Sequence, residues 1–145
     1  MATVWTIGYE RLLLQALVAE LEAAGVRRVI DVRFRPQSRR PGMSKTGLSE
    51  LLGRHGIAYE SRRALGTPAD LRWLYRNGRV AEAAQAFRRR LEDRAPDELD
   101  GLAAELDRGP ATALLCLEAD PVTCHRSVVA EALRRRRPDL VVIDL

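Results

Sequence analysis

The sequence predicts an α/β fold, a three-layer Rossmann-like sandwich with a mainly parallel sheet of about five strands. Short β-rich runs alternate with longer helical patterns along the chain. This alternation is typical of parallel strands joined by crossover helices. With 145 residues, the chain fits a single α/β domain over 1–145 that buries one sizeable core.

The first half of the chain contains three predicted strands and two predicted helices. A β-rich run at 4–7 is closed by Gly8, and leucines then recur at helical spacing until Gly25, a typical helix stop. A buried-type strand at 29–32 leads into the long loop RFRPQSRRPGMSKTG. A short helix ending near Gly56 and a strand at 57–60 follow. Loops as long as RFRPQSRRPGMSKTG are often functional in compact domains.

The second half is mainly helical. The pattern from 71 to 106 is helical, with breaks expected around Asn77 and Gly78 and around Ala95 and Pro96, and its charge indicates a solvated outer face. A fourth strand at 113–117 precedes a last helix that stops at Pro138, and 140–143 forms a closing strand.

Composition indicates a soluble cytoplasmic protein with no membrane partner. No apolar run reaches the length of a membrane helix. The start MATVWTIGYE lacks the basic and long apolar regions of a secretory signal. Two cysteines are too few for a disulfide scaffold, and reduced thiols are the default in the cytoplasm.

The basic side chains are almost all arginines, because Lys45 is the only lysine. Genome composition alone can produce such a bias. The placement is more informative, since arginines crowd the segments at 27–28 and 33–40. Planar guanidinium groups match phosphate oxygens, so we expect a phosphorylated small molecule or a nucleic acid as partner.

In an open parallel sheet, ligands gather at the carboxyl ends of the strands, where the strand order reverses. With a strand order of 3-2-1-4-5, this point lies between the first and fourth strands. The segments at 8–10, 33–36 and 116–126 leave the relevant strand ends. We therefore expect these three segments to meet in one cleft.

Five stretches of the chain together resemble a known family. They are TIGYE at 6–10, DVRFRPQSRR at 31–40, GIAYE at 56–60, LG at 65–66 and LLCLEADPVTCHR at 114–126. In this order they are similar to the bacterial family called domain of unknown function 488. The resemblance implies an α/β domain. Thr67 and Pro68 stand where the family usually has a second glycine, and the middle section at 70–108 matches least.

The segment DVRFRP suggests an anion site. Asp31 and Arg33 flank Val32 in a strand, so both side chains point to the same face. Arg33 is the expected anion ligand, and Asp31 either orients it, acts as a base, or forms a plain structural ion pair with it. Further candidates for substrate binding come from the first strand end and the arginine-rich loop: Gly8, Tyr9, Arg35, Ser38 and Arg39.

The segment CHR at 124–126 follows Asp120 and Pro121, which are good residues for a helix N-cap and first turn. We therefore expect Cys124, His125 and Arg126 in or just beyond the first helical turn. An anion is stabilised at a helix N-terminus by about 0.3 to 1 kcal/mol, and Arg126 would add to that field.

The same field favours a thiolate at Cys124, which would make it a nucleophile. Alternatively, Cys124 packs as a small apolar group and Arg126 pairs with Glu118 or Asp31. Cys116 ends an apolar run and is expected to be inert core.

Metal and cofactor chemistry find little support in the spacing. Zinc would need Cys116, Cys124, His125 and a fourth ligand such as His55 or Glu118, and adjacent residues rarely ligate one ion. We expect no metal and no cofactor. The Cys-x5-Arg spacing of cysteine phosphatases is absent, and a disulfide between the two cysteines is conceivable across the turn.

Three functions remain open. The leading one is a phosphate-anion cleft in a hydrolase or transferase that acts on a nucleotide or nucleic acid, with proton transfer by Asp31, Glu118 or His125. The second is a nucleic-acid-binding module without catalysis. The third is a thiol enzyme or redox sensor based on Cys124. Oligomeric state is not predicted.

Overall fold

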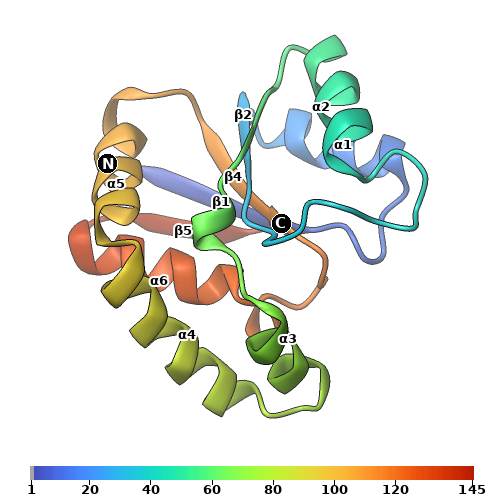
Figure 1. The fold of residues 1–145 in the computed structure, drawn as a ribbon. Coiled ribbons are helices and arrows are strands. Elements are labelled where there is room, and N and C mark those ends of the chain that lie inside the picture. The colour runs from blue at the N-terminus through green and yellow to red at the C-terminus, as the bar shows by residue number, and fades with distance from the viewer. Residues whose placement is uncertain (1) are drawn as a thin grey trace.

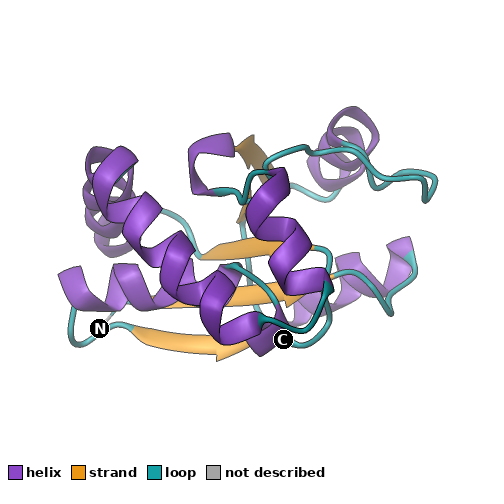
Figure 2. Ribbon diagram, turned by 60° about the horizontal axis from the view of Figure 1, so that its bottom comes forward, coloured by secondary structure: helices purple, strands orange, loops and turns teal. Residues whose placement is uncertain are grey.

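The structure, a computed structural model, describes residues 2–145. Its five strands pair in parallel in one sheet of order β3-β2-β4-β1-β5 (Figure 1), and the strands that lie across the view in Figure 2 point the same way. They are β1 (Thr3–Gly8), β2 (Arg28–Asp31), β3 (Ala58–Ser61), β4 (Thr112–Cys116) and β5 (Val141–Asp144). The predicted α/β class and five-stranded parallel sheet are confirmed.

Helices cover both faces of the sheet (Figure 1). They are α1 (Leu14–Ala23), α2 (Lys45–Arg54), α3 (Ala69–Arg76), α4 (Val80–Arg94), α5 (Pro96–Arg108) and α6 (Arg126–Arg136), with short 3-10 turns η1 (Arg63–Leu65) and η2 (Pro121–Thr123). One apolar cluster packs α1 and α2 on one face, and a larger cluster packs α4, α5 and α6 on the other. In residues 2–145, no helix combines the length and apolar character that crossing a bilayer requires.

The expected strand order 3-2-1-4-5 is wrong, because β4 lies between β2 and β1. All residues of β2 and β4 are buried, and strands buried on both faces carry no pattern that reveals their neighbours. The two orders nevertheless share the contact between β1 and β4. The chain leaves β1 for α1 on one face and leaves β4 for α6 on the other. This is the arrangement that opens a crevice at the strand ends.

The expected start of the last helix is also corrected. Asp120 accepts a hydrogen bond from the backbone N–H of Val122 at 3.0 Å, so it caps the 3-10 turn η2. Cys124 is extended, with φ −130° and ψ 147°, and α6 begins only at Arg126. Cys124 therefore precedes the helix. The two breaks predicted in the middle section are confirmed by the ends of α3 and α4.

Two glycines allow backbone segments around the strand ends to approach closely. A Cβ on Gly8, at the end of β1, would lie 1.7 Å from the carbonyl oxygen of Glu118. A Cβ on Gly66 would lie 2.3 Å from the backbone nitrogen of Phe34. Both distances are below any real contact, so these positions accept only glycine without a backbone shift.

Candidate functional site

A cavity of about 120 Å³ opens at the carboxyl ends of β1, β2 and β4. It is lined by Tyr9, Arg33, Phe34, Arg35, Gln37, Thr67, Arg72, Tyr75, Arg76, Cys116, Leu117, Glu118, Thr123, Cys124 and His125. The three segments expected to meet in one cleft all contribute to this lining. The cavity is smaller than the pockets that enclose drug-sized ligands, so it suits a small ligand or one group of a larger one.

Arg33 and Asp31 form an ion pair below the cleft. Nη2 of Arg33 donates to Asp31 at 2.7 Å and Nε at 2.9 Å, and Asp31 is fully buried. The remaining Nη1 donates to the hydroxyl of Tyr9 at 3.1 Å and to the carbonyl of Met43 at 2.8 Å. Tyr59 donates its hydroxyl to Asp31, and burial together with this hydrogen bond raises the Tyr59 pKa. The donors of Arg33 are thus used within the protein, and Asp31 does not line the cavity.

Arg126 is fully buried and binds backbone and sulfur rather than a carboxylate. Nη1 donates to Sγ of Cys116 at 3.1 Å and to the carbonyl of Glu118, and Nη2 donates to the carbonyl of Ala119 at 3.1 Å. Burial lowers the pKa of Arg126. This side chain therefore holds the loop after β4 against the start of α6.

Three other arginines bring free positive charge to the cleft: Arg35, Arg72 and Arg76. Within residues 2–145, none of the three has a carboxylate oxygen in ion-pair distance. Nε of Arg72 is buried without a hydrogen-bond partner. Burial lowers the Arg72 pKa, and the charges of Arg76 and Arg35 lower it further. An anion in the cleft would relieve this repulsion.

Tyr75 and Glu118 face the same cavity. The hydroxyl of Tyr75 is buried and, among residues 2–145, has no partner. Burial and the nearby Glu118 carboxylate raise the pKa of Tyr75 to about 12, so it remains a hydrogen-bond donor at neutral pH. Burial also raises the pKa of Glu118. Glu118 is thus the carboxyl side chain that lines this cleft, and a raised pKa favours a carboxyl group in proton transfer.

His125 is a neutral histidine under the cleft. Its Nε2 lies 2.6 Å from the carbonyl oxygen of Val32, which can only accept, so Nε2 carries the proton and Nδ1 is left as an acceptor. Burial lowers the His125 pKa to about 4. The edge of the ring packs on Phe87 at a centroid distance of 5.5 Å. Nδ1 lies 3.8 Å from Sγ of Cys124.

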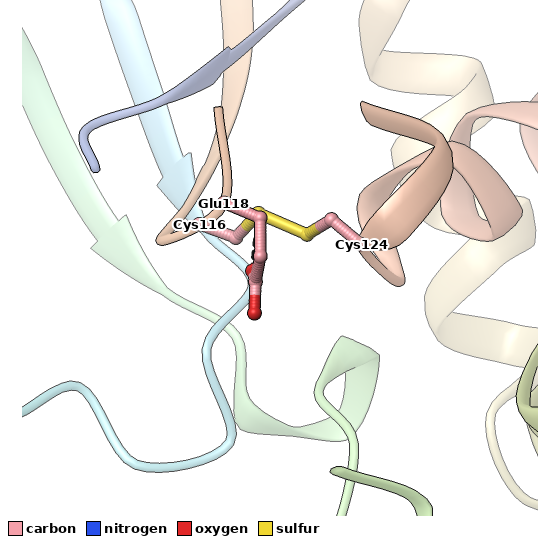
Figure 3. A group of neighbouring side chains, drawn as sticks. All are labelled: Cys116, Glu118 and Cys124. Carbon is pink, nitrogen blue, oxygen red and sulfur yellow. Dashed lines mark hydrogen bonds between the residues drawn. A yellow bond between two sulfur atoms is a disulfide. The ribbon is translucent and has the colours of Figure 1, made fainter. Parts of the chain in front are cut away.

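The two cysteines meet in the cleft and form a disulfide (Figure 3). Cys116, expected to be inert core, lines the cavity and contacts Arg126. The sulfurs and a carboxylate oxygen of Glu118 lie within 4.8 Å of one another, a group that a soft metal such as Zn²⁺ accepts when the thiols are reduced. Because the sulfurs are bonded to each other and Arg126 donates to Cys116, we assign no metal here. His55 lies elsewhere, with Nδ1 3.6 Å from Glu22.

Of the remaining residues predicted to bind substrate, some line the cavity and others lie outside it. Tyr9 and Arg35 line the cavity, whereas Gly8, Ser38 and Arg39 do not. Ser38 accepts from the backbone of Arg40 at 3.1 Å and so braces the arginine-rich loop. Arg39 is exposed.

Helix α3, which is absent from the predicted site, supplies Arg72, Tyr75 and Arg76 to the cleft. These residues stand at i, i+3 and i+4, the spacing that places side chains on one helix face. The pattern was present in the sequence. The high charge of the whole middle section instead predicts a solvated outer face, which the position of α3 at the cleft corrects.

Of the comparisons with known proteins, only the comparison with family models gives a match. No curated protein and no solved structure matches the chain. The model of a family described as domain of unknown function DUF488 matches residues 13–133. The match includes the arginine-rich loop, α3 and the segment with both cysteines, and it leaves out TIGYE at 6–10. The chain therefore belongs to the DUF488 family, as its motifs predict.

Proposed function

We propose that the cleft binds the phosphate, or a similar small anion, of a nucleotide or nucleic acid. The observation that carries the proposal is the set of unpaired donors on α3. The Nε of Arg72 and the hydroxyl of Tyr75 are both buried and unpaired within residues 2–145, and both residues line one cavity. A buried donor without a partner costs about 1–3 kcal/mol. An anion accepting from both would remove that cost.

The charge of the cleft supports the same proposal. Burial is the largest cause of the lowered pKa of Arg72, and the positive charges of Arg76 and Arg35 lower it further. Guanidinium groups donate two parallel hydrogen bonds to phosphate or carboxylate oxygens. The volume of about 120 Å³ suits the anionic group rather than a whole nucleotide, so the remainder of the ligand would extend outward.

For a hydrolase or transferase acting on this ligand, we assign proton transfer to Glu118. It lines the cavity, and burial raises its pKa. His125 is neutral with Nδ1 directed at Cys124, and Asp31 is held by Arg33, so both are less suited to meet a substrate proton. Glu118→Gln should keep anion binding and lose turnover of the nucleotide.

Thermal-shift titration tests the binding site. Wild type, Arg72→Gln and Arg54→Gln are titrated with inorganic phosphate, mononucleotides and short oligonucleotides at low and high salt. Arg54 is exposed at the end of α2, on the other face of the sheet, so its variant loses the same charge away from the cleft. A ligand at about one hundred times its Kd should stabilise wild type by about 2.7 kcal/mol. The stabilisation should persist in Arg54→Gln and vanish in Arg72→Gln. No response of wild type to any anion would overturn the proposal.

A second hollow favours the alternative of a non-catalytic nucleic-acid-binding module. It is lined by Phe34, Arg63, Ala64, Arg90, Arg94 and Ala95 and contains no acidic residue. Arg63 stacks on the ring of Phe34 at 5.1 Å, and Phe34 also lines the main cavity. Positive charge thus continues from one hollow to the next. A response to oligonucleotides alone, fading steeply with salt, would favour this module.

A further inference from the structure

Cys116 and Cys124 stand in the cleft as a pair that the anion site does not use. They lie eight positions apart in the sequence, at the end of β4 and in the turn before α6 (Figure 3). Each is 1 % exposed, yet both line the cavity. A protein thiol cannot reach sulfurs buried this deeply, whereas a small molecule entering the cavity can.

Cys116 has the surroundings of a stabilised thiolate. Nη1 of Arg126 donates to its Sγ at 3.1 Å. Arg126 has no carboxylate oxygen in ion-pair distance within residues 2–145, so no direct ion pair competes with its hydrogen bond to the sulfur. The acidic side chain that faces Cys116 is Glu118, which has a carboxyl oxygen 3.7 Å from the sulfur. Burial raises the pKa of Glu118 and so favours its neutral, protonated form. A neighbouring arginine lowers the pKa of a thiol.

Cys124 has a hydrogen-bond acceptor beside it. Its Sγ lies 3.8 Å from Nδ1 of His125, and the bond from Nε2 to Val32 leaves Nδ1 unprotonated. Nδ1 of His125 can therefore accept a hydrogen bond from the Cys124 thiol and orient it, while the lowered pKa of about 4 makes His125 a weak base. The two cysteines thus have different partners, a cation for Cys116 and a hydrogen-bond acceptor for Cys124.

We propose that Cys116 and Cys124 are a reversible dithiol site oxidised by a small hydroperoxide, with Cys116 as the reacting thiolate and Cys124 as the resolving cysteine. This inference does not depend on the anion-binding proposal. It assigns the first attack to Cys116 rather than to Cys124.

The reaction balances in two steps. The Cys116 thiolate attacks the terminal oxygen of the hydroperoxide, the O–O bond breaks, and the departing alkoxide takes a proton from solvent, leaving a sulfenic acid. The Cys124 sulfur then attacks the Cys116 sulfur and releases its proton. The S–O bond breaks, and the departing hydroxide recovers that proton as water. Two thiols and one hydroperoxide become a disulfide, an alcohol and water. A small dithiol then reduces the disulfide by exchange.

The test uses the reduced full-length chain treated with hydrogen peroxide, with dimedone to trap sulfenic acid. In wild type, both free thiols should be lost within one chain, and dithiothreitol should restore them. In Cys124→Ser, dimedone should label Cys116. In the matched Cys116→Ser variant, Cys124 should remain largely unlabelled over the same time. Unfolding in urea abolishes the contact with Arg126 and should remove this selectivity.

Because both cysteines are buried, a serine variant can fail to fold. Differential isotope alkylation of reduced wild type provides a second measurement, in which Cys116 should be alkylated before Cys124. The proposal is overturned if peroxide leaves both thiols free in wild type, or if it links chains instead of closing the pair. Faster labelling of Cys124 than of Cys116 would overturn the assignment of roles.

Discussion

Arg33 holds Asp31 in a buried, two-pronged ion pair, with Nη2 2.7 Å from one carboxylate oxygen and the Asp31 side chain fully shielded from solvent. The two residues stand two positions apart at the end of β2. Arg33 also donates to the hydroxyl of Tyr9 and to the carbonyl of Met43, so it connects the end of β2 with the segments that contain these two residues. Its contacts indicate a contribution to stability.

Arg33→Met should therefore destabilise the protein strongly. It leaves the Asp31 charge buried and unpaired, which costs about 3–5 kcal/mol. Urea unfolding monitored by circular dichroism measures this loss. Arg79→Gln is the matched control, because the pair of Arg79 with Glu82 is exposed, and such pairs contribute about 1 kcal/mol or less. Equal losses in the two variants would contradict a structural role for the buried pair.

Stability should fall as the pH drops below about 6.5, because His125 is neutral and buried. Its pKa is lowered to about 4 in the folded protein, against about 6.5 in the unfolded chain. The unfolded state therefore binds a proton first, and stability is lost as the pH falls from the unfolded toward the folded pKa. Between about pH 7 and about pH 5 the loss should be about 2 kcal/mol. Urea unfolding at both pH values should show a smaller loss for His125→Gln, and an unchanged pH dependence would refute this cause.

Gly8→Ala should destabilise the protein, because the new methyl group would meet the carbonyl of Glu118 at 1.7 Å. Overpacking of this kind costs about 1–3 kcal/mol. Gly101→Ala is the control. It lies inside α5, and beyond its chain neighbours and the backbone of its own helix nothing lies within 4 Å of its Cβ position, so alanine there should stabilise by about 0.5–1 kcal/mol. Thermal unfolding should give shifts of opposite sign, and a neutral Gly8→Ala would show that β1 and the Glu118 loop are not closely packed.

Tyr75→Phe should separate ligand binding from stability. Its hydroxyl is buried without a partner within residues 2–145, so removing it should leave stability unchanged or slightly increased. Hydrogen bonds to charged groups contribute about 1.5–3 kcal/mol, so affinity for phosphate should fall about tenfold or more. Thermal unfolding and calorimetric titration measure the two effects. A marked loss of stability with unchanged affinity would assign the hydroxyl to the fold instead.

Local features of the fold were readable in the sequence. Asn77 and Gly78 were expected to break the middle helices, and Gly78 has a positive φ of 75°, where glycine is favoured. Pro96 was expected at the second break, and it begins α5, a position where its missing N–H costs nothing. Each of these signals depends on one or two residues and their immediate neighbours.

Features that depend on distant contacts were not readable. The insertion of β4 between β1 and β2 follows from packing of strands buried on both faces, and the run TALLC carries no mark of it. The burial of Arg126 depends on carbonyl groups of Glu118 and Ala119 that only the folded loop presents. The role of α3 at the cleft likewise required the fold, although the spacing of Arg72, Tyr75 and Arg76 pointed to a common face.

We propose that the unpaired Nε–H of Arg72 binds an anion in the cleft, and NMR of arginine Nε–Hε signals tests this binding most directly. Phosphate is titrated into the labelled protein, with Arg54 as the internal reference. A saturable shift of the Arg72 signal, with little change at Arg54, is the predicted result. An Arg72 signal that stays fixed, or that moves only in parallel with exposed arginines, would contradict the claim.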